Sequence, residues 1–217
     1  GLLVVQGPVS FNGTKFEQVV DLSRSVFLQP VTLSGAQFLR ESYFVQGRFL
    51  RDLYAEGTMF GPHTRFHRSV FQGPVTFRQS RFNGLAEFLE VTFEKDADLS
   101  HSYFTLGTGF SGSRFQGRAD FSEVTFEREA FFTFTLFEGD AYFPGARFQS
   151  TADFSDASFK GRDDFSKAHF NQKPQFTGAA KPATVQAAQE SENPMVPYAV
   201  GFTLLAFIAL LAVYVIR

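Results

Sequence analysis

The sequence predicts an all-β solenoid wound into 22-residue coils, on three observations. Large apolar residues form a ladder from Phe11 to Phe176 with alternating steps of five and six residues. Of its 31 rungs, 27 are Phe, three are Leu and one is Ala55. The residue two positions before most rungs is small, and glycine follows many rungs. Such short-period self-similarity is typical of repeat architectures.

The local pattern favours strands over a helix. A small and a large apolar residue separated by one polar position alternate with the period of a strand, and glycines such as Gly73 and Gly139 supply turns. A long helix with an eleven-residue period is the rival, but at about 100° per residue it would place alternate rungs on nearly opposite sides. Four sides of five, six, five and six residues instead make one coil.

This coil length predicts the core. Residues 22 apart should stack about 4.8 Å from one another. The expected core ladder includes one column of Phe82, Phe104, Phe126, Phe148 and Phe170, and another of Phe121, Phe143 and Phe165. Ala55 interrupts the second column. We expect Leu53 and Tyr54 to fill the gap, with a local distortion over residues 53–57.

Three segments carry a motif that resembles a known family, the pentapeptide-repeat proteins. They are Ala119-Asp120-Phe121-Ser122, Ala152-Asp153-Phe154-Ser155 and Ala97-Asp98-Leu99-Ser100. The resemblance covers about residues 9–176, although this chain inserts one residue in every second unit. It implies a right-handed quadrilateral β-helix.

The chain divides into three parts. Residues 1–176 form the expected solenoid, where Leu2 to Val5 either cap the first coil or are a remnant of a hydrophobic leader. Residues 177–197 are rich in Ala, Pro, Gln and Glu and are expected to be a linker with one short helix near 184–191. Residues 198–216 contain no charge, and as a helix of about 28 Å they are expected to span a membrane.

The sequence offers little for chemistry. It has no cysteine, a net charge of −2 and a pI of about 6.1. His63, His67, His101 and His169 accompany no cluster of carboxylates, and no phosphate-binding loop or nucleophile elbow is present. We therefore expect no catalytic site, metal, cofactor or small-molecule substrate.

Charge is distributed unevenly along the expected rod. Residues 1–83 carry nine Lys or Arg against five Asp or Glu, whereas residues 84–176 carry nine against fifteen. The arginines scatter over different columns, so nucleic-acid binding is not expected. Asp98 and Asp120 suggest a calcium column, but the neighbouring column alternates in sign, which favours ion pairs between coils. That column is Asp96, Arg118, Asp140 and Arg162.

Two sets of residues are expected to bind partner proteins. Phe131, Phe134 and Leu136 crowd together off the ladder, and exposed aromatic clusters mark protein contacts. In the expected membrane span, small residues share one helix face and would let a partner helix approach closely. They are Ala199, Thr203 and Ala206. A generic tether without a specific face is the alternative.

These observations favour a non-catalytic, membrane-anchored accessory subunit of a membrane protein complex. The family resemblance implies a respiratory or photosynthetic complex. The alternative is a free-standing, tethered binding or inhibitory protein of the cell envelope. Arg217 after the span and Glu190 and Glu192 before it place the solenoid in the periplasm or lumen by the positive-inside rule. A tail-anchored protein with a cytoplasmic solenoid would have a similar sequence.

Overall fold

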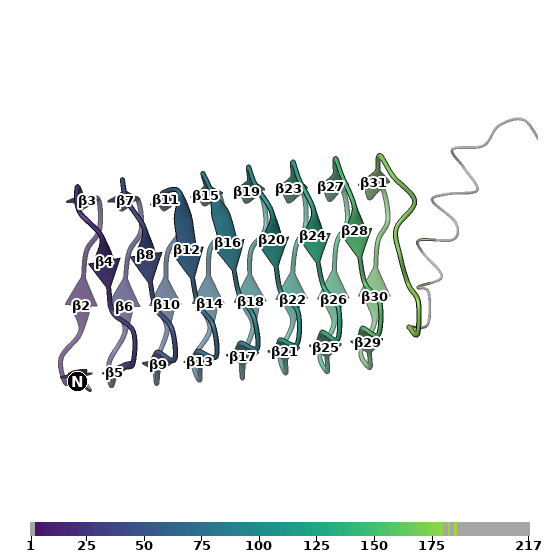
Figure 1. The fold of residues 1–217 in the computed structure, drawn as a ribbon. Helices are drawn as coiled ribbons and strands as arrows, with labels where there is room; N and C mark the ends of the chain where they lie inside the picture. Colours follow the sequence, from purple (N-terminus) through teal and green to yellow (C-terminus); the bar gives the residue numbers. More distant parts are fainter. Residues whose placement is uncertain (1–2, 180–181, 183–184, 186–217) are drawn as a thin grey trace, which may run out of the picture.

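The structure, a computed structural model, describes residues 3–179, 182 and 185 of the chain. These residues form a β-solenoid with four strands in each coil and 31 strands in the described part (Figure 1). Strands four apart in the chain pair side by side, so the coil builds four parallel sheets. The predicted all-β solenoid is therefore confirmed.

Each sheet lies along one side of the rod. The first contains β1 (Leu3–Val5), β5 (Ser25–Phe27), β9 (Arg48–Phe49), β13 (Val70–Phe71), β17 (Thr92–Phe93), β21 (Arg114–Phe115), β25 (Leu136–Phe137) and β29 (Ser158–Phe159). The second contains β2 (Val9–Ser10), β6 (Val31–Thr32), β10 (Leu53–Tyr54), β14 (Val75–Thr76), β18 (Ala97–Asp98), β22 (Ala119–Asp120), β26 (Ala141–Tyr142) and β30 (Asp163–Asp164). The third contains β3 (Lys15–Phe16), β7 (Gln37–Phe38), β11 (Met59–Phe60), β15 (Arg81–Phe82), β19 (Tyr103–Phe104), β23 (Thr125–Phe126), β27 (Arg147–Phe148) and β31 (His169–Phe170). The fourth has seven strands: β4 (Val20–Asp21), β8 (Ser42–Tyr43), β12 (His63–Arg65), β16 (Leu85–Glu87), β20 (Thr108–Gly109), β24 (Ala130–Phe131) and β28 (Ala152–Asp153).

The register of the strands matches the 22-residue coil. Phe82 pairs with Phe104, and Phe104 pairs with Phe126, in neighbouring parallel strands. Each coil therefore places the same inward positions over those of the coil before it. The small residue before a rung faces inward too, as Ala119 and Ala141 do with no exposed surface.

Stacked phenylalanine rings fill the interior. Phe82, Phe104, Phe126 and Phe148 are at most 1 % exposed, and Phe170 near the end of the rod is half-buried. Phe121, Phe143 and Phe165 are fully buried. Rings within a column are stacked with nearly parallel planes. Rings of neighbouring columns meet edge to face, an arrangement that aromatic pairs prefer to a face-to-face sandwich.

The expected distortion at residues 53–57 is wrong. Leu53 and Tyr54 of β10 keep their register with both neighbouring strands. Leu53 occupies the inward position where the two neighbouring coils have Val31 and Val75 and later coils have Ala, and it is 1 % exposed. The larger side chain there supplies the volume that Ala55 lacks. Tyr54 fills no gap, because it points outward and donates a hydrogen bond to Asp52 Oδ2 at 2.6 Å.

The turns depend on the polar residue before the rung and on glycine. Asp98 Oδ1 accepts a hydrogen bond from the Ser100 backbone N–H at 2.8 Å, an Asx turn that explains the Asp in the repeat motif. Glycine is needed where successive coils approach closely. A Cβ at Gly139 would lie 2.2 Å from the Gly117 carbonyl oxygen, so only glycine fits.

Buried hydroxyls complete the hydrogen bonding at the corners. Ser80 Oγ donates to the Ala55 carbonyl at 2.5 Å and accepts from the Thr58 N–H at 3.0 Å. Ser80 is 1 % exposed, so its hydroxyl satisfies backbone groups that water cannot reach.

The two ends of the rod differ. In the first coil, inward residues such as Phe11 and Phe16 are only half-buried, and Leu3 to Val5 pair with β5 as a capping segment would. Near the other end, Val185 is fully buried against the core. Apart from Val185, the helix expected at 184–191 lies outside the described residues.

The membrane span expected at 198–216 also lies outside the described residues, together with its small face of Ala199, Thr203 and Ala206. Within residues 3–179, 182 and 185, the structure contains no helix of the length and apolar character that crossing a bilayer requires.

Candidate protein-binding face

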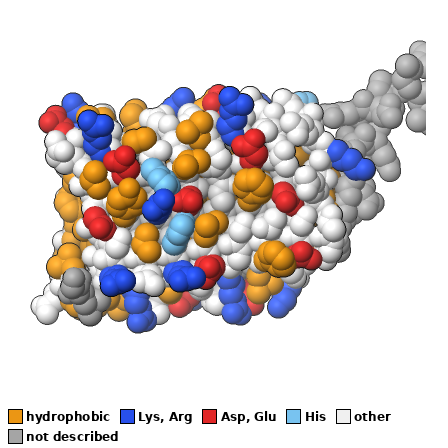
Figure 2. Space-filling view, viewed as in Figure 1, with side chains coloured by type: hydrophobic (Ala, Val, Ile, Leu, Met, Phe, Trp, Pro, Cys, Tyr) orange, Lys and Arg blue, Asp and Glu red, His pale blue; other side chains and the backbone are white. Residues whose placement is uncertain are grey.

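The outer surface of the seven-stranded sheet, here called the seven-stranded face, is unusually apolar. The described residues include ten exposed large hydrophobic side chains, and five of them lie on this face or at its borders. They are Val19, Leu85, Leu106, Phe131 and Phe134. Figure 2 shows the face from the front, with two histidines near its centre and hydrophobic side chains on several sides of them. Such a concentration marks this face as the candidate site.

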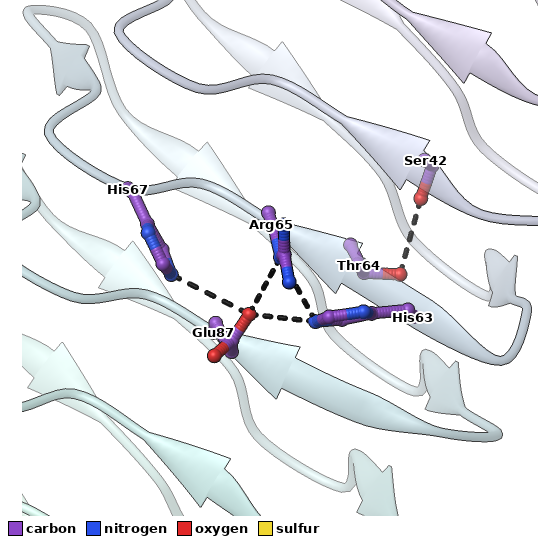
Figure 3. Close-up of polar contacts among 6 residues, drawn as sticks. All are labelled: Ser42, His63, Thr64, Arg65, His67 and Glu87. Carbon is purple, nitrogen blue, oxygen red and sulfur yellow. Dashed lines mark hydrogen bonds and ion pairs between the residues drawn. The ribbon is translucent and has the colours of Figure 1, made fainter.

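A polar cluster joins two neighbouring strands at the centre of the face (Figure 3). Glu87 of β16 stacks in register on Arg65 of β12, and its Oε2 accepts from Arg65 Nε at 2.8 Å. His63 Nε2 lies 2.6 Å from the same oxygen. His67 Nε2 lies 3.5 Å from it. Three side chains of one coil therefore share one carboxylate of the next coil.

The contacts of His63 indicate which of its ring nitrogens carries a proton. Its Nε2 contacts both a carboxylate oxygen and Arg65 Nε, the latter at 3.0 Å. A carboxylate only accepts hydrogen bonds, so the 2.6 Å contact requires a proton on His63 Nε2. Arg65 then donates its single Nε proton to Glu87. Burial raises the pKa of Glu87, but the hydrogen bonds from His63 and Arg65 together outweigh burial and hold that pKa below its ordinary value.

His67 is the less satisfied histidine. Its Nε2 is shielded from solvent and has no hydrogen-bond partner among the described residues. Burial lowers the pKa of His67 and outweighs the attraction of Glu87, which acts in the opposite direction. The fold therefore favours a neutral imidazole at this position.

The cluster is not built as a metal centre. The Arg65 guanidinium lies against the carboxylate and His63, where its positive charge takes the place of a metal ion. In the described part of the chain, no three His or carboxylate side chains are placed to hold a metal.

The histidines accompany no cluster of carboxylates along the sequence, but stacking of the coils brings single carboxylates to three of them. His63 and His67 both face Glu87, and His101 Nδ1 lies 3.5 Å from Glu123 Oε2. The separations are 20 to 24 residues, so the cluster is invisible along the chain. Comparing positions 22 apart would have found it, because Arg65 and Glu87 share a column.

Beside the cluster, a strand without outward side chains crosses the face. In β20 and its flanks the outward positions are Gly107 and Gly109. A Cβ at Gly107 would lie 3.6 Å from Leu85 Cδ2, and one at Gly109 would lie 2.8 Å from Leu89 Cδ2. The two leucines therefore lie over the glycines, and apolar surface connects the polar cluster to the next coil.

On the far side of this strand are the predicted partner-binding residues. Phe131 is 39 % exposed on β24, and Phe134 is 68 % exposed at the following turn. Leu136 begins β25 on the neighbouring sheet and is half-buried. The three side chains thus surround one corner of the rod, and the inside positions beside them belong to the fully buried Phe132 and Phe137.

Phe134 also stands in a backbone conformation that disfavours it. Its φ is 56°, in the left-handed region, at a position where the coil before it has Gly112 at 69°. A bulky side chain is uncommon there, although the conformation itself is a regular feature of the turns and is shared by nine other non-glycine residues in the described part of the chain. The fold gains nothing from an exposed aromatic ring at this turn.

A shallow groove continues the face toward the first coils. It has a volume of about 560 Å³ and is lined by Asp21, Ser23, Arg24, Tyr43, Val45, Gln46 and Arg65. A second hollow of about 230 Å³ shares Val45 and Gln46 with it and reaches His67 and Leu89. The seven-stranded face is therefore hollowed at one end and carries protruding aromatic rings toward the other.

The predicted alternation of charge is only partly realised as ion pairs. Arg162 binds Asp140 one coil away, and its Nη2 donates to Asp140 Oδ2 at 2.7 Å. Arg118 instead pairs with Asp120 in its own coil at 2.6 Å, while its backbone N–H donates to Asp96. The nearer carboxylate captures the guanidinium, so Asp120 forms an ion pair within its own coil and Arg118 forms none with the coil before it.

Comparison with known proteins agrees with this architecture. Residues 62–103 and 121–169 match the model of the family described as pentapeptide repeats, in nine copies. A search of curated proteins found no significant match. Both matched segments lie within the solenoid, whose coils have the small residue and the large inward rung of that repeat. The two matched segments of this β-solenoid are thus similar to pentapeptide repeats.

Proposed function

We propose that the chain is a non-catalytic, membrane-anchored accessory subunit of a membrane protein complex, with its seven-stranded face as a protein-binding surface. The observation that carries this proposal is the exposure of Phe131 and Phe134, 39 % and 68 %, beside a core that is already filled. Large apolar side chains that the fold does not need are best explained by a partner that covers them.

The composition of the face also supports protein recognition. Aromatic residues and arginine dominate binding energy at protein interfaces, and both occur here, in Tyr43 and Arg65 as well as in the exposed Phe residues. The Arg65 guanidinium lies 5.7 Å from the centre of the Tyr43 ring, so both are positioned before a partner arrives. Preorganised side chains lose less entropy on binding.

Purification in mild detergent tests the proposal. The wild-type chain is expected to co-migrate with a large assembly, and Phe131→Ala combined with Phe134→Ala should weaken that association without unfolding the rod. Tyr54→Ala is the matched control, because Tyr54 is 42 % exposed on the second sheet. A wild-type chain that purifies without other subunits would favour the tethered binding or inhibitory protein instead.

The anchor rests on the sequence of residues 198–216. Ala199, Thr203 and Ala206 would form the face that meets a partner helix, because small residues allow close packing in lipid. Ala206→Phe should then release the chain from its complex while leaving it in the membrane fraction. Unchanged co-purification would reduce the span to a tether.

The proposed orientation places the solenoid in the periplasm or lumen. It rests on Arg217 after the span and on Glu190 and Glu192 before it. Protease added to sealed vesicles of known sidedness tests it. Loss of the solenoid from vesicles with the cytoplasmic side outward would contradict this orientation.

A further inference from the structure

Two columns of outward residues on the seven-stranded face have the same order of residue types. Strand pairing stacks the first column, which is Arg65, Glu87, Gly109, Phe131 and Asp153. The second column lies three residues further along each coil and is Arg68, Glu90, Gly112, Phe134 and Asp156. All members of the second column have φ between 55° and 69°, so they occupy equivalent turn positions. The order Arg, Glu, Gly, Phe, Asp therefore occurs twice on one face.

The charges at the start of both columns neutralise each other. Arg65 Nε donates to Glu87 Oε2 at 2.8 Å. Arg68 binds Glu90 twice, through Nε at 3.0 Å and through Nη2 at 3.3 Å. Each of these four charges therefore has a counter-charge within the chain.

The charges at the other end of both columns are not neutralised in this way. Phe131 pairs in register with Asp153, and Phe134 precedes Asp156 by one coil. Neither aspartate forms an ion pair with a described residue, and no described cation lies over either ring. Each column thus ends on an exposed aromatic ring next to a carboxylate that lacks a cation.

The second sheet shows what an aromatic ring beside an aspartate can hold. Asp120 and Tyr142 pair in register in neighbouring strands, as Phe131 and Asp153 do. The Arg118 guanidinium donates to Asp120 Oδ2 at 2.6 Å and lies 4.3 Å from the centre of the Tyr142 ring. One cation therefore binds a carboxylate and an aromatic face together, and both contacts attract it.

We propose that the Phe131–Asp153 and Phe134–Asp156 pairs each receive a lysine or arginine side chain of the partner subunit. The inference rests on the proposed function, because it names the chemistry of the segment that covers this face. The partner's cation would lie over the exposed ring and beside the carboxylate, as Arg118 does on the second sheet.

Both pairs are open to such a side chain. The Phe131 and Phe134 rings are 39 % and 68 % exposed, and Asp156 is exposed as well. Asp153 is half-buried, and its Oδ1 accepts from the Ser155 N–H at 2.9 Å. Asp153 Oδ2 has no hydrogen-bond partner among the described residues, so it can accept from a cation that approaches from outside.

The charge around the two pairs favours a basic segment. The two coils that contain them, residues 121–164, carry nine Asp or Glu against four Lys or Arg. Arg128 belongs to the same coils and forms no ion pair with either aspartate. A net negative surface attracts a basic segment and repels an acidic one.

A partner without charge would bind this surface poorly. Covering the exposed rings also removes water from the neighbouring aspartates, and a carboxylate without water or a counter-charge is costly. The segment that covers Phe131 and Phe134 must therefore compensate Asp153 and Asp156. The negative charge likewise opposes insertion of the rings into a membrane with anionic lipids.

Neutralising the two aspartates tests the proposal in the assembly purified in mild detergent. Asp153→Asn combined with Asp156→Asn should raise the dissociation constant of the chain from its complex about tenfold or more. Asparagine retains an oxygen that can accept from the Ser155 N–H, so the turn is kept. Asp164→Asn is the matched control, because Asp164 Oδ1 accepts from the Ser166 N–H in the same kind of turn on the second sheet.

Ionic strength separates the contribution of charge from that of apolar contact. Raising the salt concentration from about 0.1 M to about 0.5 M should weaken association of the wild-type chain, because salt screens exposed charges. The D153N/D156N variant should respond less to salt, since it has lost the two carboxylates.

Photo-cross-linking followed by charge reversal tests the contact directly. The full chain with p-benzoylphenylalanine in place of Phe134 keeps an aromatic group at this turn, and sequencing of the cross-linked peptide should find a lysine or arginine beside the attachment point. Replacing that cation by Glu should release the chain from the complex. Asp156→Lys should then restore the complex, because the two charges are exchanged.

Unchanged association of the D153N/D156N variant, a cross-linked peptide without lysine or arginine at the attachment point, or a charge exchange that fails to restore the complex would overturn the inference. The proposed function would survive these results if Phe131→Ala combined with Phe134→Ala still released other subunits. If the two Phe substitutions also leave the complex intact, this face is not the protein-binding surface and the proposed function fails with the inference.

Discussion

The ring of Phe126 stacks on the ring of Phe148 in the next coil, with centroids 5.0 Å apart and planes 17° apart. On its other side it stacks on Phe104 at 5.1 Å. It also meets Phe132 edge to face at 6.0 Å, so one fully buried ring joins two columns of the core. These contacts predict that Phe126 contributes more to the stability of the fold than an exposed aromatic residue does.

Replacing Phe126 by Ala should reduce the free energy of unfolding by about 3–5 kcal/mol, because it leaves a cavity between stacked rings that cannot collapse. Phe131→Ala is the matched control. Phe131 is 39 % exposed on β24 and should change the free energy of unfolding by less than about 1 kcal/mol. Denaturant titration followed by circular dichroism measures both values. Equal losses would contradict the inside and outside assignments.

The close approach of neighbouring coils at some glycines predicts that two Gly→Ala substitutions will differ in their effect on stability. Gly139→Ala would place a methyl group 2.2 Å from the Gly117 carbonyl oxygen, and the backbone must move to relieve it. We expect a loss of about 1–3 kcal/mol or more, as in other overpacked sites. Gly107→Ala is the control, since its Cβ would lie at an ordinary 3.6 Å from Leu85 Cδ2. Thermal melts that show equal effects would refute this explanation of the glycines.

The buried hydroxyls predict a third effect. Ser80→Ala removes the group that joins the Ala55 carbonyl to the Thr58 N–H and leaves the two without this partner in the interior. The expected loss in the free energy of unfolding is about 1–3 kcal/mol. Ser158→Ala is the control because Ser158 is exposed on β29. Similar unfolding curves for the two variants would show that the Ser80 bridge is dispensable.

The spacing of phenylalanine predicts most of this fold because each rung is a core position. Steps of five and six residues fix the coil, and the coil fixes the stacking of Phe82 on Phe104 and of Phe121 on Phe143. The rule failed at Ala55, where a single missing ring suggested distortion. Leu53 restores the volume from a position that holds Val in the neighbouring coils and Ala in later ones. Core volume belongs to the coil as a whole and cannot be read from one column.

The candidate site is less predictable, because it depends on outward side chains that the fold does not constrain. The clustering of apolar residues off the ladder predicted correctly that Phe131 and Phe134 are exposed. The sequence did not predict the contacts of Glu87 with His63 and His67, because these residues come together only through the stacking of β12 and β16. The bare strand β20 is likewise not apparent from the sequence, because Gly107 and Gly109 come next to Leu85 and Leu89 only through the stacking of coils.

The last prediction concerns the loss of folding stability at low pH. The pKa of His67 is below its ordinary value of 6.5, mainly because the side chain is buried. The unfolded chain therefore binds a proton at this histidine more readily than the folded chain does, and stability must fall as the pH drops below about 6.5. The pKa of Glu87 is below its ordinary value of 4.5, so the stability it contributes is complete above that pH and is lost only in stronger acid.

Two stages of acid destabilisation should follow, and a substitution separates them. His67→Gln cannot titrate, so the fall in stability that begins near pH 6.5 should become smaller while the loss below pH 4.5 remains. His101→Gln is the matched control, because His101 is 41 % exposed and lies on another corner of the rod. The measurement is the urea midpoint between about pH 2 and pH 8 for the wild type and both variants, with about 1–3 kcal/mol/M expected for the slope of each transition. If His67→Gln keeps the whole of the upper stage, the buried imidazole is not its source, and the neutral state assigned to His67 is wrong.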